Sequence, residues 1–132
     1  MNLPRILFVD ESRDTCEMAK AWLSQLEYEV EAAESVFEGL RKVQSGRFDL
    51  YILGNKFPDG EGSELCALIR KTDSATPIIF YSGDSTEKLN SALGCGAQAW
   101  VLKPELNKLR TAISYALNIG IEVSEEKGKV KG

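Results

Sequence analysis

Five short apolar runs alternate with helix-like segments, and this alternation constrains the fold more than any other feature of the chain. The runs are Arg5–Val9, Glu29–Ala32, Leu50–Leu53, Pro77–Tyr81 and Ala99–Leu102. Three of them are nearly continuous in apolar residues, which is typical of parallel strands covered on both faces. Strict alternation of strand and helix predicts an α/β fold, in which a parallel sheet carries helices on both sides and right-handed crossovers leave few topologies.

The segments between the runs carry apolar residues at helical steps of three and four. The expected helical sets are Cys16, Ala19, Leu23 and Leu26; Val36, Phe37, Leu40 and Val43, ending at Ser45-Gly46; Leu65, Leu68 and Ile69; Leu89, Ala92 and Leu93, opened by Asp84 or Ser85 and ended by Gly94; and Leu106, Leu109, Ile113, Ala116 and Leu117. We place one domain over residues 4–120. Residues 121–132 are polar and glycine-bearing, so we expect a frayed tail there.

Composition excludes several function classes. The net charge is -4 with no basic cluster, so we expect no nucleic-acid partner. The apolar runs are far shorter than the roughly 20 residues of a membrane span. No signal-peptide core follows Met1, so we expect a cytoplasmic protein. The absence of histidine removes Ser-His and Cys-His catalysis and histidine phosphocarriers, which predicts a protein that is not an enzyme.

The three cysteines, Cys16, Cys66 and Cys95, are widely spaced and form no Cys-x-x-Cys pair. An odd number at such spacing favours small buried apolar residues in a reducing cytosol. We therefore expect free thiols in the core.

Seven residues lie at or just after the ends of four predicted strands, where open parallel sheets place their ligand chemistry. They are Asp10, Glu11, Gly54, Ser82, Gly83, Lys103 and Pro104. We expect Asp10, Glu11 and Lys103 to form a charged pocket in which Lys103 pairs with one of the two carboxylates.

With these residues in place, the chain resembles a response-regulator receiver domain of two-component signalling. The matching segments, in order, are residues 6–11, 48–62 with Pro58 and Gly62, 77–83, and 96–104. The resemblance implies a flavodoxin-like (βα)5 fold, a doubly wound five-stranded parallel sheet of strand order 2-1-3-4-5. It also implies a role in phosphorelay signal transduction.

The resemblance assigns roles one residue at a time. Asp10 and Glu11 match the acidic pair that holds Mg²⁺, and Lys56 matches the residue whose backbone carbonyl assists. Ser82, beside Gly83, matches the hydroxyl residue that bonds the phosphoryl group. Lys103 matches the lysine that neutralises its charge, and the bond to Pro104 is implied to be cis. Trp100 matches the aromatic switch, although packing alone also explains a tryptophan there.

Gly54 falls on the phosphoacceptor aspartate, and here the resemblance fails. An acyl phosphate needs a carboxylate nucleophile, which glycine lacks, and Mg²⁺ should bind more weakly without it. Asp49 lies roughly 16 Å away along the strand and cannot substitute. We therefore predict a degenerate receiver, a pseudo-receiver without the usual acceptor. A changed residue in an otherwise active receiver is the other explanation of Gly54.

Other interpretations stay open. Asp59, or with less reason Asp10, could serve as a non-standard acceptor in an active receiver. A flavin-binding protein of the same fold is disfavoured, because the carboxylates of the loop after the first strand would repel phosphate. By family analogy, the partner is another signalling protein: a histidine kinase, a response regulator or an output protein. It would bind through about Ser85–Ile119, and a homodimer is a further expectation.

Overall fold

The computed structural model describes residues 2–83 and 94–128, with residues 119–128 described by their backbone alone. The expected fourth helix, with Leu89, Ala92 and Leu93, falls outside the described residues. Among the described helices, none is long and apolar enough to cross a membrane.

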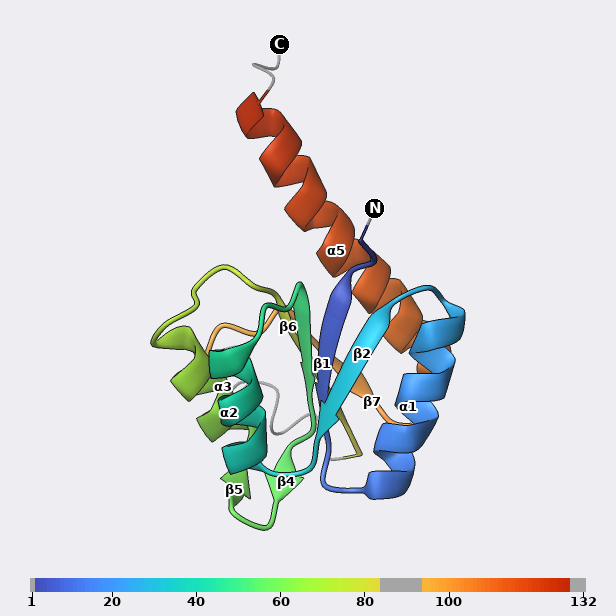
Figure 1. Ribbon diagram of the computed structural model, residues 1–132, viewed down its shortest axis with the longest axis vertical. Helices are drawn as coiled ribbons and strands as arrows, with labels where there is room; N and C mark the ends of the chain where they lie inside the picture. Colours follow the sequence, from blue (N-terminus) through green and yellow to red (C-terminus); the bar gives the residue numbers. More distant parts are fainter. Residues whose placement is uncertain (1, 84–93, 129–132) are drawn as a thin grey trace.

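A five-stranded parallel sheet forms the centre of the molecule (Figure 1). Its strands, in spatial order, are β2 (Glu29–Ala33), β1 (Arg5–Val9), β3 (Leu50–Leu53), β6 (Ile78–Ser82) and β7 (Ala99–Leu102). This order confirms the expected 2-1-3-4-5 arrangement, because β4 (Lys56–Phe57) and β5 (Gly60–Glu61) pair separately as a small antiparallel hairpin. The sequence indicates only a turn-rich loop there, and Gly60, at a φ of 152°, turns the hairpin.

Helices cover both faces of the sheet. In Figure 1, α2 (Val36–Ser45) and α3 (Gly62–Arg70) lie on one face, and α1 (Arg13–Gln25) and α5 (Leu106–Gly128) lie on the other. Alternate strand residues therefore enter two separate cores. Leu7, Val9 and Leu53 face α2 and α3, whereas their neighbours Phe8 and Ile52 face α1 and α5.

Side-chain caps begin the first three helices. Ser12 accepts from the Thr15 N–H at the start of α1, and Ser35 accepts from the Glu38 N–H at the start of α2. Glu61 and Glu64 form a capping box at α3. Because these caps lie next to the strand ends, they fix where each loop of the sheet's carboxyl edge turns back into a helix.

Two expectations from the sequence are wrong in detail. Helical spacing places Phe37 on the apolar face of α2, but it is 66% exposed, with the Arg41 guanidinium 5.9 Å from its ring centroid. Helix α5 continues to Gly128, and the frayed tail over residues 121–132 stays an expectation.

The second correction concerns the cysteines. Cys66 of α3 and Cys95 are joined by a disulfide, and Cys16 is the free thiol. Sequence spacing could not show this pairing, because the two residues are 29 apart in the chain and meet through the fold. Cys16 is a buried core residue, as expected.

Candidate functional site

A pocket of about 130 Å³ lies at the carboxyl ends of the central strands. It brings together residues from four separate strand ends. They are Asp10, Glu11, Gly54, Asn55, Lys56, Ser82, Gly83 and Lys103. Every strand-end residue singled out in the sequence except Pro104 lines this pocket.

Asp10 follows β1 and is 2% exposed. Its Oδ1 accepts the Ser12 N–H at 2.9 Å, and its Oδ2 accepts from Lys103 Nζ at 2.7 Å. A buried carboxylate is tolerated when charge-assisted hydrogen bonds compensate its lost hydration. The expected pairing of Lys103 is therefore present, and its partner is Asp10 rather than the exposed Glu11.

Lys103 is positioned by β7, which ends one residue before it. Its backbone N–H donates to the Ser82 carbonyl at 2.9 Å, and its bond to Pro104 is cis. Its ammonium lies 5.8 Å from the centroid of the Tyr81 ring. Burial, followed by the charge of Asp10, raises the pKa of Tyr81, so its hydroxyl stays neutral beside the ion pair. Ser82 is buried at the same strand end.

Gly54 follows β3 at the floor of this pocket, where its N–H donates to the Val9 carbonyl at 2.7 Å. A Cβ built at Gly54 would lie 3.4 Å from both Asp10 Oδ2 and the Val9 carbonyl oxygen, which is ordinary contact. Gly54 is also not among the positive-φ glycines. Neither the backbone nor the space for a Cβ therefore requires glycine at the acceptor position.

The side chains present fit a divalent ion poorly. Mg²⁺ prefers carboxylate and carbonyl oxygens in a near-octahedral shell. Among residues 2–83 and 94–128, no three aspartate, glutamate or cysteine side chains lie together as a metal-binding group. The buried Asp10 carboxylate is already neutralised by the Lys103 ammonium, and Gly54 offers no oxygen from a side chain.

Asp59 has another task. One carboxylate oxygen accepts the Val36 N–H and the other accepts the Phe37 N–H, both at 2.9 Å. Asp59 thus binds the first turn of α2 and does not line the pocket. The Phe37 and Val36 N–H groups lower the pKa of this carboxyl. Asp49 lies at the opposite edge, as expected, where it accepts the Arg5 N–H at 2.8 Å.

Asp59→Ala should remove a pH-dependent contribution to stability. A lowered folded-state pKa stabilises the protein fully above the unfolded-state value, near 3.8, and this contribution is lost as pH falls through the folded-state pKa. The difference in melting temperature between native protein and variant should therefore be present near pH 7 and shrink towards about pH 3. A difference that is equal at both pH values would contradict the capping role. Asp59→Asn is the matched control, because it keeps an acceptor oxygen that does not titrate.

Two further residues bear on the site: Asn55 lines the pocket, and Trp100 does not. Asn55 was not singled out in the sequence, yet it is 5% exposed and its carbonyl accepts the Gly62 N–H at 2.7 Å. Its place directly after Gly54 was the available signal. Trp100 stacks on Phe80 with ring centroids 5.3 Å apart and packs against the core on the α2–α3 face. The structure thus shows its packing, and its switch role stays an expectation.

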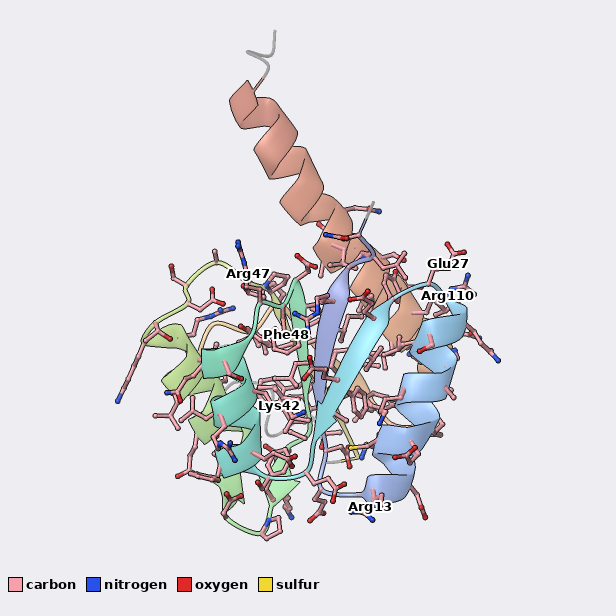
Figure 2. All side chains as sticks on the ribbon, viewed as in Figure 1. Arg13, Glu27, Lys42, Arg47, Phe48 and Arg110 are labelled. Atoms are coloured by element: carbon pink, nitrogen blue, oxygen red, sulfur yellow. A yellow bond between two sulfur atoms is a disulfide. The ribbon has the colours of Figure 1, made fainter. Side chains whose placement is uncertain are left out.

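A larger hollow of about 520 Å³ lies at the other end of the sheet, where Arg47 and Phe48 are labelled in Figure 2. It is lined in part by the buried Tyr51, whose hydroxyl is 3.1 Å from Asp73 Oδ2. Burial, with the Asp73 charge second, raises the pKa of Tyr51 to about 12. This hollow lies at the amino ends of the strands, so the smaller pocket is the better candidate for function.

Comparisons with known proteins agree with this geometry. The model of the response regulator receiver domain family matches residues 6–114. The nisin biosynthesis regulatory protein NisR of Lactococcus lactis is 33% identical over 101 residues, which are 76% of this chain and 44% of that protein. The response regulator protein PilR of Pseudomonas aeruginosa is 27% identical over 96% of this chain and 29% of its own length. The chain thus spans less than half the length of these relatives.

Solved structures match over most of the chain. A CheY-like receiver domain protein from Methanospirillum hungatei superimposes with a TM-score of 0.87 at 32% identity, covering 92% of this chain and 98% of that one. The response regulator TrrA of Thermotoga maritima, solved in complex with Mg²⁺ and beryllofluoride, gives 0.81 at 31% identity, covering 87% and 100%. Because the family model, the strand order and the strand-end pocket agree, the chain belongs to the response regulator receiver domain family of two-component signalling.

Proposed function

We propose that this receiver signals through protein–protein contacts that do not depend on phosphorylation at the usual position. The observation that carries this proposal is the 2.7 Å ion pair between Lys103 and Asp10 in a pocket whose acceptor position is Gly54. A receiver with this pocket has no carboxylate nucleophile at the end of β3.

The ion pair also joins distant parts of the chain. Lys103 and Asp10 are 93 residues apart in sequence, so their bond links the end of β7 to the end of β1. An incoming phosphoryl group would have to compete with Asp10 for the lysine. Removing either partner leaves the other without its compensating charge, which in a buried site is costly. The pair therefore favours a single arrangement of the loops around the pocket.

We expect this pocket to bind a divalent ion only weakly. Asp10, Glu11 and the Lys56 carbonyl are the groups that would hold Mg²⁺. They would do so without a carboxylate from position 54 and against the positive charge of Lys103. We propose that Mg²⁺ binding is weakened for this reason. No other cofactor is proposed.

The proposed partner is another signalling protein: a histidine kinase, a response regulator or an output protein. Receiver domains act through kinases and output domains, and the surface used by analogy spans about residues 85–119. The described part of that surface includes β7 and the first turns of α5, where Tyr115 is 67% exposed. A homodimer through the same surface is a further proposal, as is a cytoplasmic location.

A beryllofluoride titration tests the proposal. Beryllofluoride with Mg²⁺ imitates a phosphoryl group on an acceptor carboxylate, and TrrA, which was solved in such a complex, serves as the positive control. We expect no saturable change in the backbone amide NMR signals of Ser82, Gly83 and Lys103 of the native chain. Saturable shifts at these residues would overturn the proposal, because they would show a working phosphoryl site without an aspartate at position 54.

A further inference from the structure

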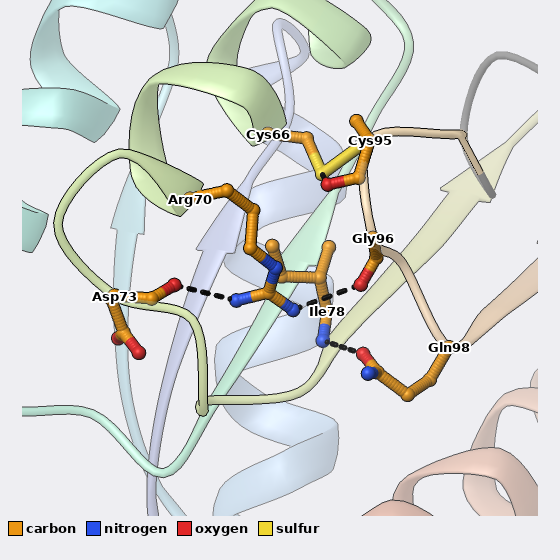
Figure 3. The surroundings of a disulfide bond; sticks show 7 residues. All are labelled: Cys66, Arg70, Asp73, Ile78, Cys95, Gly96 and Gln98. Atoms are coloured by element: carbon orange, nitrogen blue, oxygen red, sulfur yellow. Dashed lines mark hydrogen bonds between the residues drawn. A yellow bond between two sulfur atoms is a disulfide. The ribbon is translucent and has the colours of Figure 1, made fainter.

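We propose that Cys66 and Cys95 form a reversible thiol–disulfide site that ties α3 to the segment entering β7. The two cysteines are bonded to each other, and their Cα atoms are 6.0 Å apart (Figure 3). This Cα separation lies within the range that a disulfide requires. The two backbones therefore need no movement for the bond to form or to break.

Hydrogen bonds to α3 and to β6 (Ile78–Ser82) hold the segment entering β7 independently of the sulfur atoms. The Arg70 guanidinium reaches from α3 to two carbonyl oxygens, that of Asp73 at 2.9 Å and that of Gly96 at 3.0 Å (Figure 3). Ile78 and Gln98 exchange two further bonds, because the Ile78 N–H donates to Gln98 Oε1 at 2.6 Å and the Gln98 N–H donates to the Ile78 carbonyl at 2.8 Å. The Arg70–Gly96 bond links the segment to α3 and the Ile78–Gln98 bonds anchor it to β6, so the segment beside Cys66 has contacts that do not depend on the disulfide.

Glycine at position 96 permits this close approach. Its φ is +100°, and a Cβ there would lie 2.9 Å from Arg70 Nε. Because side chains rarely adopt such a backbone and the guanidinium occupies the space, Gly96 both turns the segment and admits Arg70. The segment between Cys95 and β7 thus packs directly against Arg70 of α3 at Gly96.

The reduced form also has its partners in place. Cys66 is fully buried in the core between the sheet and α3, where a thiol behaves as a small apolar group. Its Sγ lies 3.4 Å from the Cys95 carbonyl oxygen, which can accept an S–H hydrogen bond once the disulfide is opened. Cys66 therefore has suitable surroundings in both oxidation states.

The exchange step follows from the difference in exposure. Cys95 is partly exposed and Cys66 is not, so a dithiol reductant attacks Cys95 Sγ. The disulfide breaks, the electron pair passes to Cys66 Sγ, and Cys66 takes up a proton. The second thiol of the reductant then displaces Cys95 as a thiol and the reductant becomes a disulfide, so two electrons and two protons enter the protein. A disulfide oxidant such as oxidised glutathione reverses the step.

The expected consequence lies in the segment that leads to the pocket. Residues 96–98 run from Cys95 into β7, which carries Trp100 and ends beside Lys103. Oxidation adds a covalent link from this segment to α3, whereas the reduced form relies on the Arg70 and Gln98 bonds. Disulfides in cytosolic proteins are mostly transient or redox-sensing, which favours a reversible site if the location is cytoplasmic.

Cysteine counting tests the site. The folded native chain is equilibrated with oxidised glutathione or with dithiothreitol. The reagent is removed, the protein is denatured in the presence of N-ethylmaleimide to label its free thiols, and the intact mass is measured. We expect one labelled thiol, Cys16, after oxidation and three after reduction of the folded protein. In Cys66→Ser and in Cys95→Ser, the number of labelled thiols should be the same after both treatments. In Cys16→Ser, the difference of two labelled thiols between the treatments should remain. Three labels after glutathione treatment, or reduction that requires prior unfolding, would overturn the proposal.

Cys16 is a suitable internal reference. It lies in α1 on the opposite face of the sheet, and burial raises the pKa of its thiol to about 11. It should therefore stay a thiol in the folded protein under both treatments.

Hydrogen exchange tests the link to β7. We expect the amides of residues 95–98 to exchange roughly tenfold faster in the reduced protein, while those of β1 stay unchanged. Equal exchange in both forms would overturn the claim that the disulfide holds this segment. Either result leaves the proposal about Gly54 untouched, because that proposal rests on the charged pocket alone.

Discussion

Gly62→Ala is expected to destabilise the fold by more than about 4 kcal/mol, a large share of the roughly 5–15 kcal/mol that stabilises a typical domain. Gly62 begins α3, and its N–H donates to the Asn55 carbonyl at 2.7 Å. A Cβ at Gly62 would lie so close to the Gly54 carbonyl oxygen that the two could not coexist, and it would also lie 2.9 Å from the Phe80 ring. The start of α3 and the end of β3 would have to separate.

Chemical denaturation followed by circular dichroism measures this effect, with Gly94→Ala as the matched control. Among the described residues, nothing lies within 4 Å of a Cβ at Gly94, so this variant should change the free energy of unfolding by less than about 1 kcal/mol. If Gly62→Ala unfolded at the same denaturant concentration as the native chain, the close packing of α3 on β3 would be wrong.

Gly54→Asp is expected to give the pocket a stronger dependence on Mg²⁺ than the weakened one proposed for the native chain. The new carboxylate would grow from a Cβ 3.4 Å from Asp10 Oδ2, in a pocket that also contains Glu11. Without a cation the like charges should cost roughly 1–3 kcal/mol. At a Mg²⁺ concentration about one hundred times the dissociation constant, binding should stabilise the folded variant by about 2.7 kcal/mol.

Thermal unfolding with and without Mg²⁺ checks this expectation. A stabilisation of this size should raise the melting temperature of Gly54→Asp by several degrees, and the native chain should respond much less. Gly54→Ala is the control, since it adds the Cβ without a carboxylate and should respond no more than the native chain. If the melting temperature of Gly54→Asp ignored Mg²⁺, the pocket would have lost more than its acceptor.

The sheet was predictable from the sequence because its strands are buried on both faces. Ile6–Val9 and Ile78–Tyr81 are nearly continuous apolar runs, and that pattern arises in few other settings. Phe37 was misplaced for the opposite reason. The helical period of α2 assigns a stripe of residues to the core, but it cannot say where the edge of the neighbouring helix leaves a residue exposed.

The pocket was predictable where sequence order determines position, as it does at strand ends. Asp10, Gly54, Ser82 and Lys103 each lie at a strand end, so a parallel sheet brings them to one edge. The Cys66–Cys95 disulfide and the attachment of Asp59 to α2 were not predictable in this way. Both depend on contacts between elements that are distant in the chain, and neither leaves a local pattern.

Intact mass after incubation with Mg²⁺ and acetyl phosphate tests the central claim most directly, with native chain and Gly54→Asp treated side by side. Our account predicts that the native chain gains no phosphoryl group and that Gly54→Asp gains one, because the variant restores the carboxylate nucleophile beside Lys103. A native chain that gains a phosphoryl group would contradict the account, and mapping the modified residue would identify the acceptor that replaces position 54.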